Sequence, residues 1–278
     1  GLSQATIKEW KIGYHPPDSL LKAKDIQGLC DVGLLGQEDG RVWERFAGRI
    51  MFPICDDQGR VVGFSGRIME GDGAKYVNTP QTPVFDKGGI LFGMHKAKRS
   101  ILAANLAIIA EGQLDIIALH AMGLQGAVAA QGTAFTKQHA ISIKRLCERA
   151  ILCMDPDPAG VKATGKMIGL LAEAGVKVDV ATLDQDPADS IKADGGADIA
   201  ERINSAVPWH EWMLLQPDPA PKVSEILCYI SDEIEREKII DATVVSTRIP
   251  HDRIRAMSTR QRPTHQETQP IQMAPAMQ

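Results

Sequence analysis

The sequence lacks paired cysteines, long apolar runs and an overall excess of basic residues. Five cysteines are scattered along 278 residues without a CxxC pair, so we predict neither a disulfide framework nor bound zinc, and we expect a reducing, cytoplasmic compartment. The longest apolar candidate, residues 102–110, is strand-sized, whereas a membrane helix needs about 20 residues. No basic and apolar leader opens the chain, so no secretory signal is expected. Because residue 1 is Gly rather than Met, we expect a processed or engineered piece or a fragment of a longer protein.

Charge is distributed unevenly along the chain. The formal net charge is −4, with 44% hydrophobic and 24% charged residues, which is ordinary for one large or two modest soluble domains. Residues 41–99 hold ten basic and six acidic side chains, whereas acids outnumber bases over 111–202. This asymmetry predicts phosphate contacts in the first stretch and cation binding in the second.

Strand and helix patterns divide the chain. We expect short helices and turns over 1–45, with Ser3 as a helix cap and Gly13 ending that helix, followed by two strands around a turn at 56–59. Apolar strands at 106–110, 126–129, 150–154 and 177–183 alternate with helices at 113–122, 136–148 and 159–174. Such alternation predicts a parallel sheet with helices on its faces, and the continuous apolar strands agree.

The last part of the chain reads as helices followed by a polar tail. Ile226, Ile230, Ile234 and Ile239 have helical spacing, and the residues after about 257 have few apolar anchors. We therefore predict four parts: an N-terminal α+β subdomain over 1–105, a parallel-sheet domain over 106–205, a helical subdomain over 206–257 and a disordered tail over 258–278.

Acidic side chains follow three of the predicted parallel strands. Glu111 follows the first, Asp155 and Asp157 follow the third, and the fourth is followed by Asp184, Asp186 and Asp189. Carboxyl ends of parallel strands share one edge of a sheet, so these acids would converge and repel one another. A divalent cation would offset the repulsion, and oxygen ligands without His or Cys favour Mg²⁺ or Mn²⁺. The alternative is that these residues only start turns and cap helices.

A second pattern in this region is misleading. Residues 160–167 nearly match a phosphate-binding P-loop, but Met167 stands where the loop needs Ser or Thr. We expect a helix there instead.

Several motifs together resemble one family. Glu111-Gly112 with Asp155-Pro-Asp157 is similar to the Toprim signature of primases, type IA and II topoisomerases and some nucleases. A longer ordered set resembles the catalytic core of bacterial-type replicative DNA primases over about residues 1–257. The motifs are Arg49-Ile-Met-Phe-Pro-Ile54, Gly63-Phe-Ser-Gly-Arg67, Lys75-Tyr-Val-Asn78-Thr-Pro80, Phe85-Asp-Lys87-Gly88, Leu91-Phe-Gly93, Glu111-Gly-Gln-Leu-Asp115 and Asp155-Pro-Asp-Pro-Ala-Gly160.

The resemblance implies a fold and a set of site residues. The fold would be α/β: a Toprim-type parallel sheet flanked by helices, after a mixed α+β basic subdomain and before a small helical subdomain. Glu111, Asp155 and Asp157 would be catalytic and hold two or more Mg²⁺ or Mn²⁺ ions, with Asp115, Asp186 and Asp189 completing the acidic site and no zinc in this chain. The residues implied in contacts with nucleotide and nucleic acid are Arg45, Arg49, Arg67, Lys75, Tyr76, Asn78 and Lys87, of which Lys75 and Lys87 would also be catalytic.

The implied activity is synthesis of short RNA primers on DNA by metal-dependent nucleotidyl transfer. The implied partners are a single-stranded DNA template, an RNA primer, ribonucleoside triphosphates and a replicative helicase, the last through a domain missing or reduced here. The setting would be the cytoplasm at the replication fork, without a membrane. A Toprim nuclease and a non-catalytic single-stranded DNA-binding module remain alternatives. A topoisomerase would need a nucleophilic tyrosine, and none of Tyr14, Tyr76 and Tyr229 stands in such a setting.

The chain departs from the family pattern at three places near the acids. Gln113 replaces the usual aromatic or hydrophobic residue, Pro156 replaces glycine, and Asp189 falls one place later than the usual second acid after the fourth strand. The family's N-terminal zinc ribbon is absent from this sequence.

Overall fold

Residues 2–130 and 134–259 are described by a computed structural model of the chain. Their N-terminal part contains a four-stranded antiparallel sheet in the order β1 (Gly13–His15), β4 (Arg49–Cys55), β5 (Val61–Ile68) and β6 (Tyr76–Asn78). The expected hairpin turn joins β4 and β5: the amides of Gln58 and Arg60 both donate to Asp56 Oδ1 at 3.0 Å. The two strands predicted around this turn are confirmed.

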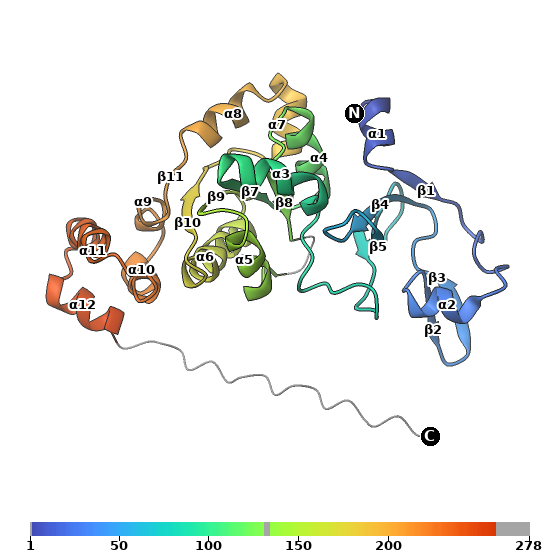
Figure 1. Cartoon of the computed structure of the whole chain (residues 1–278), viewed down its shortest axis with the longest axis horizontal. Helices are drawn as coiled ribbons and strands as arrows, with labels where there is room; N and C mark the ends of the chain where they lie inside the picture. The colour runs from blue at the N-terminus through green and yellow to red at the C-terminus, as the bar shows by residue number, and fades with distance from the viewer. Residues whose placement is uncertain (1, 131–133, 260–278) are drawn as a thin grey trace.

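The first 45 residues hold more strand than the sequence predicted. A separate ribbon pairs β2 (Leu35–Glu38) with β3 (Arg41–Glu44) next to α2 (Ile26–Asp31), while α1 (Gln4–Glu9) lies apart from it, before β1 (Figure 1). Ser3 caps α1 as expected, accepting from the Thr6 amide at 3.1 Å. Gly13 does not end that helix, because α1 stops at Trp10 and Gly13 begins β1 against Met51.

The second sheet contains the four predicted parallel strands. Its order is β11 (Val207–Pro208), β10 (Lys177–Val180), β9 (Arg149–Cys153), β7 (Leu106–Ala110) and β8 (Ala127–Ala129), with only β11 antiparallel. The chain runs from β7 to β8 on one side and then returns to β9 on the other side of β7. The point between β7 and β9 is therefore a topological switch point, where parallel sheets leave a crevice for ligands.

Helices cover both faces of this sheet. They are α3 (Met94–Ala104), α4 (Gln113–Ala121), α5 (Lys137–Lys144), α6 (Pro158–Glu173), α7 (Pro187–Asp194) and α8 (Ala197–Asn204). The stretch that resembles a P-loop lies inside α6, so the expected helix is confirmed there. The helix expected at 136–148 is shorter, because it ends at Arg145 before the chain turns into β9.

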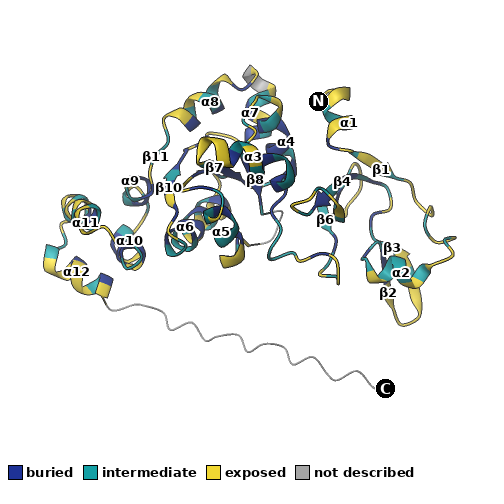
Figure 2. Cartoon of the chain, viewed as in Figure 1, coloured by how far each residue is buried: buried dark blue, intermediate teal, exposed yellow. Residues whose placement is uncertain are grey.

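Side chains that alternate along the strands supply two cores. The strands at the centre of this sheet are mostly buried (Figure 2). Ala107 and Ile109 of β7 join one core with α3, α5 and α6, while Ile108 and Ala110 join the other with α4 and α8. The second core also includes Phe52 of β4. The N-terminal sheet is therefore packed directly onto the parallel sheet through shared apolar residues.

The C-terminal part of the described chain is helical, as predicted. It contains α9 (Trp209–Leu214), α10 (Pro219–Leu227), α11 (Glu233–Thr247) and α12 (His251–Thr259). These helices lie on the opposite side of the parallel sheet from the N-terminal sheet (Figure 1). None of the helices within 2–130 and 134–259 is both long and apolar enough to span a membrane.

The helical spacing read across Ile226, Ile230, Ile234 and Ile239 was wrong. Asp232 begins a new helix by accepting from the amides of Ile234 and Glu235, so Ile226 and Ile239 belong to different helices. Both are buried, whereas Ile234 is 71% exposed. The predicted tail over 258–278 lies outside the described residues from 260 onward.

Candidate active site

Acidic side chains lie at the ends of three neighbouring strands of the parallel sheet. Glu111 directly follows β7, Asp155 stands two residues after β9, and β7 pairs with β9 up to Ala110 and Cys153. Asp186 lies beyond β10, the next strand over. The structure therefore brings these acids to one edge, at the switch point between β7 and β9.

Asp155 is the acid most strongly affected by its surroundings. Burial, followed by the negative charges of Glu111, Asp115, Asp186 and Asp157, raises the pKa of Asp155 to about 7. Its Oδ1 atom is buried without a hydrogen-bond partner. The charges that act on Asp155 identify the acidic group of this site, which comprises Glu111, Asp115, Asp155, Asp157 and Asp186.

Asp115 is the deepest member of this acidic group. It is 8% exposed and accepts hydrogen bonds from the amides of Gly112 at 2.9 Å and Ala188 at 3.3 Å. Burial still raises the pKa of Asp115 to about 6, and the nearby charges of Asp186 and Glu111 act in the same direction. A buried carboxyl surrounded by other carboxyls favours the protonated form, or a cation in its place.

Two acids of the group also cap helices, as the alternative interpretation expects. Asp157 accepts from the Gly160 amide at the start of α6, and Asp186 accepts from the Asp189 amide at the start of α7, each at 2.7 Å. A proline follows each cap at the first helical position. Gly160 is required here, because a Cβ atom at this position would stand 2.1 Å from the Asp155 carbonyl oxygen.

Asp184 and Asp189 lie outside the acidic group. Asp184 pairs with Arg202 and Asp189 pairs with Lys192. Hydrogen bonding to Lys192 lowers the pKa of Asp189, which also hydrogen-bonds to Asp186. Neither Asp184 nor Asp189 is among the main charges that raise the pKa of Asp155. The later position of Asp189 in the sequence thus places it on the Lys192 side of α7, and its role as a metal ligand stays a prediction.

The acidic group fits a hard divalent cation chemically. All of its ligand atoms are carboxylate oxygens, it includes an unpartnered buried oxygen on Asp155, and the neighbouring carboxylates raise the pKa of Asp155 and Asp115. As these side chains stand, no three His, Cys, Asp or Glu residues of the described part already enclose a metal position.

The basic motif borders this acidic group through Tyr76. Arg67 on β5 pairs in register with Tyr76 on β6, and its guanidinium carbon lies 5.8 Å from the centre of the tyrosine ring. Burial raises the pKa of Tyr76, Arg67 opposes the shift, and Asp115 and Asp186 add to it. Tyr76 therefore lies within the electrostatic reach of both the arginine and the acids, so the two regions meet at this ring.

Lys75 and Lys87 lie on loops beside the N-terminal sheet. Lys75 is exposed directly before β6, and its charge contributes, after Lys192, to the lowered pKa of Asp189. Lys87 lies in a tight turn in which the Gly89 amide donates to the Asp86 carbonyl at 3.2 Å. Among the described residues, no ion pair engages Lys87.

Arg49 and Arg45 hold backbone carbonyls. Arg49 is 9% exposed, and its Nη1 donates to Gly66 at 3.2 Å and to Ala74 at 2.9 Å. The two bonds together link Gly66 of β5 to Ala74, the residue before Lys75. Arg45 donates from Nε to the Gly33 carbonyl at 3.2 Å. Both arginines support the backbone, and their contact with nucleic acid stays a prediction.

Sequence reasoning missed a polar link across the two sheets. Gln113 Nε2 donates to Ser65 Oγ at 2.6 Å, and both residues are buried. Ser65 is on β5 and Gln113 is the first residue of α4, two positions after Glu111. The signal for this link was the polar residue at 113, where the family pattern has an aromatic or hydrophobic one.

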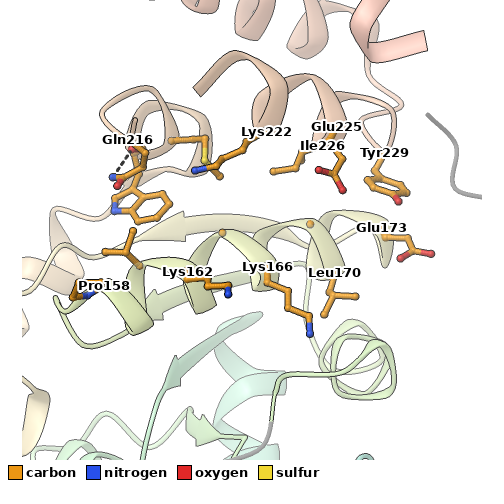
Figure 3. A pocket seen from close by; sticks show the side chains of 15 residues that line it. Pro158, Lys162, Lys166, Leu170, Glu173, Gln216, Lys222, Glu225, Ile226 and Tyr229 are labelled. Atoms are coloured by element: carbon orange, nitrogen blue, oxygen red, sulfur yellow. Dashed lines mark hydrogen bonds between the residues drawn. The ribbon is translucent and has the colours of Figure 1, made fainter. Parts of the chain in front are cut away.

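A groove of about 550 Å³ lies elsewhere, between α6 and the helices α9 and α10 (Figure 3). Lys162 and Lys166 contribute from α6, and Lys222, Glu225 and Tyr229 come from the opposite wall. None of the acidic or basic site residues described above lines this groove.

Comparisons with known proteins agree with this architecture. Residues 1–98 match the family described as the N-terminal domain of the DNA primase catalytic core, and residues 108–191 match a Toprim-like family. The solved catalytic core of the E. coli primase is 30% identical, with a TM-score of 0.76 over 90% of this chain and 88% of that chain. The chain belongs to the DNA primase catalytic-core family.

Other primase cores share the same fold. A DNA primase domain from Pseudomonas aeruginosa is 29% identical, with a TM-score of 0.82 over 93% of this chain and 89% of that one. A DNA primase of Deinococcus radiodurans is 42% identical over 217 residues, or 73% of this chain and 38% of that protein. The chain thus spans about a third of the length of the curated primases that it matches. Membership of the Toprim-like family implies the use of a divalent metal ion.

Proposed function

We propose that this chain is the catalytic core for DNA-templated synthesis of RNA primers from ribonucleoside triphosphates. The observation that carries the proposal is the position of Tyr76, whose ring lies 5.8 Å from the Arg67 guanidinium carbon and whose pKa responds to Asp115 and Asp186. Nucleotidyl transfer needs cations bound next to a triphosphate, and here carboxylates and a basic motif share one site.

The acidic group holds the metal. Glu111, Asp155 and Asp157 would be the ligands, with Asp115 and Asp186 beside them, and together they would hold two or more Mg²⁺ or Mn²⁺ ions. When bound, such ions activate the attacking hydroxyl and neutralise charge that develops on the phosphate oxygens. Asp115 and Asp186 are fixed by backbone amides of α4 and α7, so they offer the substrate a preorganised edge.

The basic motif holds the nucleotide and the template. Lys75 and Lys87 bind the triphosphate, while Arg67, Tyr76 and Asn78 bind the nucleotide or the primer and template backbone. Arg45 and Arg49 extend this surface through the backbone they support. Phosphate contacts of this kind set the position of a nucleic acid without reading its sequence. The 3′ oxygen of the primer then bonds to the α-phosphorus, and the bond to the leaving pyrophosphate breaks.

The proposed partners follow from the same reaction. They are single-stranded DNA, an RNA primer and ribonucleoside triphosphates, and a solved primase catalytic domain 29% identical to this chain was bound to single-stranded DNA. We also propose a replicative helicase as partner and a cytoplasmic location at the replication fork. Within the chain, the subdomains are 1–105, 106–205 and 206–257, with the acids on the second and the basic motif on the first.

The test is extension of a short RNA primer on single-stranded DNA with labelled ribonucleotides and Mg²⁺ or Mn²⁺. Metal-dependent extension that Asp155→Ala abolishes, while leaving DNA binding largely intact, would support the proposal. Metal-dependent strand cleavage in place of extension would contradict it and favour a nuclease. DNA binding with neither activity would favour a binding module.

A further inference from the structure

We propose that Thr136 is a positioning residue for Lys87. It fixes the position of Lys87 through a hydrogen bond to the carbonyl of Gly88, the residue that follows Lys87. The Thr136 hydroxyl donates to the Gly88 carbonyl at 2.6 Å, from the parallel-sheet domain to the basic motif. This inference rests on the proposed function, because it gives Lys87 the triphosphate as its ligand.

Thr136 has two hydrogen-bond partners at once. Its Oγ1 accepts from the His139 amide at 3.1 Å, which makes it the N-cap of α5, and its proton goes to Gly88. A hydroxyl is suited to this double role because it offers one donor and two acceptor lone pairs. An ordinary N-cap needs only the acceptor. The bond to Gly88 is therefore beyond what capping α5 requires.

The turn around Lys87 is held on both sides of that residue. The Lys87 amide donates to Gln81 Oε1 at 3.1 Å, the Gly88 amide donates to Asp86 Oδ1 at 3.1 Å, and the Gly88 carbonyl accepts from Thr136. The ammonium group has no ion pair within the described residues, as noted above. A fixed backbone that carries an unengaged cation is prepared for an anionic ligand, because less freedom is lost on binding.

The helix that begins at Thr136 is tied to α6 at the end of α6 that lies away from the acids. Lys137 of α5 forms an ion pair at 2.5 Å with Glu173, the last residue of α6, whereas Asp157 caps the first turn of that helix. The Gly88 bond therefore joins the Lys87 turn to the parallel-sheet domain without involving the acidic group. Loss of the bond should displace Lys87 while leaving the acids in place.

Two substitutions of Thr136 and one of Lys87 separate positioning from capping. Thr136→Ser keeps both the acceptor and the donor. Thr136→Asp keeps a good N-cap but, when ionised, cannot donate to the Gly88 carbonyl. Lys87→Met, alone and combined with Thr136→Asp, removes the side chain through which Thr136 is said to act. The measurements are the KM for ribonucleotide and kcat in primer extension, the melting temperature, and hydrogen exchange of the 86–90 backbone in the full chain.

We expect Thr136→Ser to match the parent in every measurement. Thr136→Asp should raise the KM for nucleotide about tenfold, as expected when a partly buried acceptor loses its donor, with kcat changed less than about twofold. Exchange at 86–90 should rise while the melting temperature stays near that of the parent. In the Lys87→Met background, Thr136→Asp should add no further rise in KM.

Two results would overturn the inference alone. In the first, the parent is active but Thr136→Asp leaves its KM for nucleotide unchanged. In the second, Thr136→Asp raises that KM by the same factor in the Lys87→Met background as in the parent. A parent that neither extends primers nor binds nucleotide would overturn the proposed function together with the role of Lys87. In that case, faster exchange at 86–90 in Thr136→Asp would still show that Thr136 holds the turn, and unchanged exchange would contradict even that.

Discussion

The two sheets supply their site residues in opposite ways. The parallel sheet brings Glu111 and Asp155 together from the ends of adjacent strands that are far apart in sequence. The antiparallel sheet supplies Arg67 and Tyr76 from two consecutive, paired strands, with Lys75 and Lys87 on the loops around them. Crossover connections of the parallel sheet therefore assemble the acidic half of the site, whereas the pairing of consecutive strands and hydrogen bonds of nearby loops assemble the basic half.

The two halves also differ in how their charges are satisfied. Arg49 donates to two backbone carbonyls and Arg67 lies against a ring, so these cations are stabilised within the fold. On the acidic side, the neighbouring carboxylates instead raise the pKa of Asp155 and Asp115, and Asp155 keeps a buried oxygen without a partner. We conclude that repulsion within the acidic half favours binding of a cation, whereas the arginines of the basic half are already stabilised by contacts within the protein.

Asp155→Asn should have the largest effect on the acidic half of the site. Metal-derived stabilisation of a transition state is several kcal/mol, so the rate of primer extension should fall at least about a hundredfold. The free energy of unfolding of Asp155→Asn should instead rise relative to that of the parent. In metal-free buffer the parent should lose stability as pH rises from about 4 to about 7, because the unfolded Asp155 ionises near 3.8 and the folded one near 7.

Thermal melts across that pH range measure the second effect. The melting temperature of Asp155→Asn should fall less steeply with pH than that of the parent, and added Mg²⁺ should reduce the difference between them. Parallel curves for the two proteins, with or without Mg²⁺, would be inconsistent with a destabilising ionised Asp155.

Gly160→Ala tests the backbone that holds Asp155. The new Cβ would meet the Asp155 carbonyl at 2.1 Å, so we expect a loss of about 1–3 kcal/mol in the free energy of unfolding, together with reduced extension. Gly169→Ala is the matched control on the same helix, because no atom lies within 4 Å of its added Cβ. That control should gain about 0.5–1 kcal/mol, since glycine is unfavourable inside a helix. Denaturant unfolding compares the two, and equal effects would contradict the close approach.

The link between the sheets predicts a coupled pair. Gln113→Leu or Ser65→Ala alone leaves a buried polar group without its partner and should cost about 1–3 kcal/mol of unfolding free energy. The double variant should cost less than the sum of the two, because neither group is then left unpaired. Denaturant unfolding of the four proteins tests this coupling. Additive costs would mean that the hydrogen bond does not join the sheets energetically.

Asp186 and Asp189, at the start of the same helix, should differ in their effect on the extension rate, and the effect of Asp189 is the smallest that we expect. Asp189→Asn should change the extension rate less than about threefold, because the Asp189 side chain is paired with Lys192 at an exposed position. Asp186→Asn keeps the helix cap but removes a charge from the acidic group, so we expect at least about a tenfold loss. Steady-state extension rates decide between them. A larger loss for Asp189→Asn would place the later acid in the metal site.

The sequence predicted the acidic half of the fold better than the basic half. Strands such as 106–110 are buried on both faces and bounded by helices, so their apolar runs reveal them. The short strands β1, β2 and β3 have no such runs, because their side chains are mostly exposed and tertiary pairing forms them. The isoleucine pattern failed for the opposite reason: its spacing continued across Asp232, where the chain starts a new helix.

The candidate site shows the same division. Strand ends indicated where the acids gather, and the family resemblance identified the basic motif. Spacing could not show that Asp189 turns to Lys192, because only the fold of α7 decides which acid points where. Nor could it find the bonds from Gln113 to Ser65 and from Thr136 to Gly88, whose partners are far apart along the chain.

Single-nucleotide extension under separate titration of metal and nucleotide tests most directly whether the two halves serve one reaction. Asp186→Asn represents the acidic half and Lys75→Met the basic half. We predict that Asp186→Asn will require more divalent metal at an unchanged KM for nucleotide, and that Lys75→Met will raise that KM at an unchanged metal requirement. Variants that both shift only the metal requirement, or that both leave extension at the parent's rate, would contradict a site shared by the two sheets.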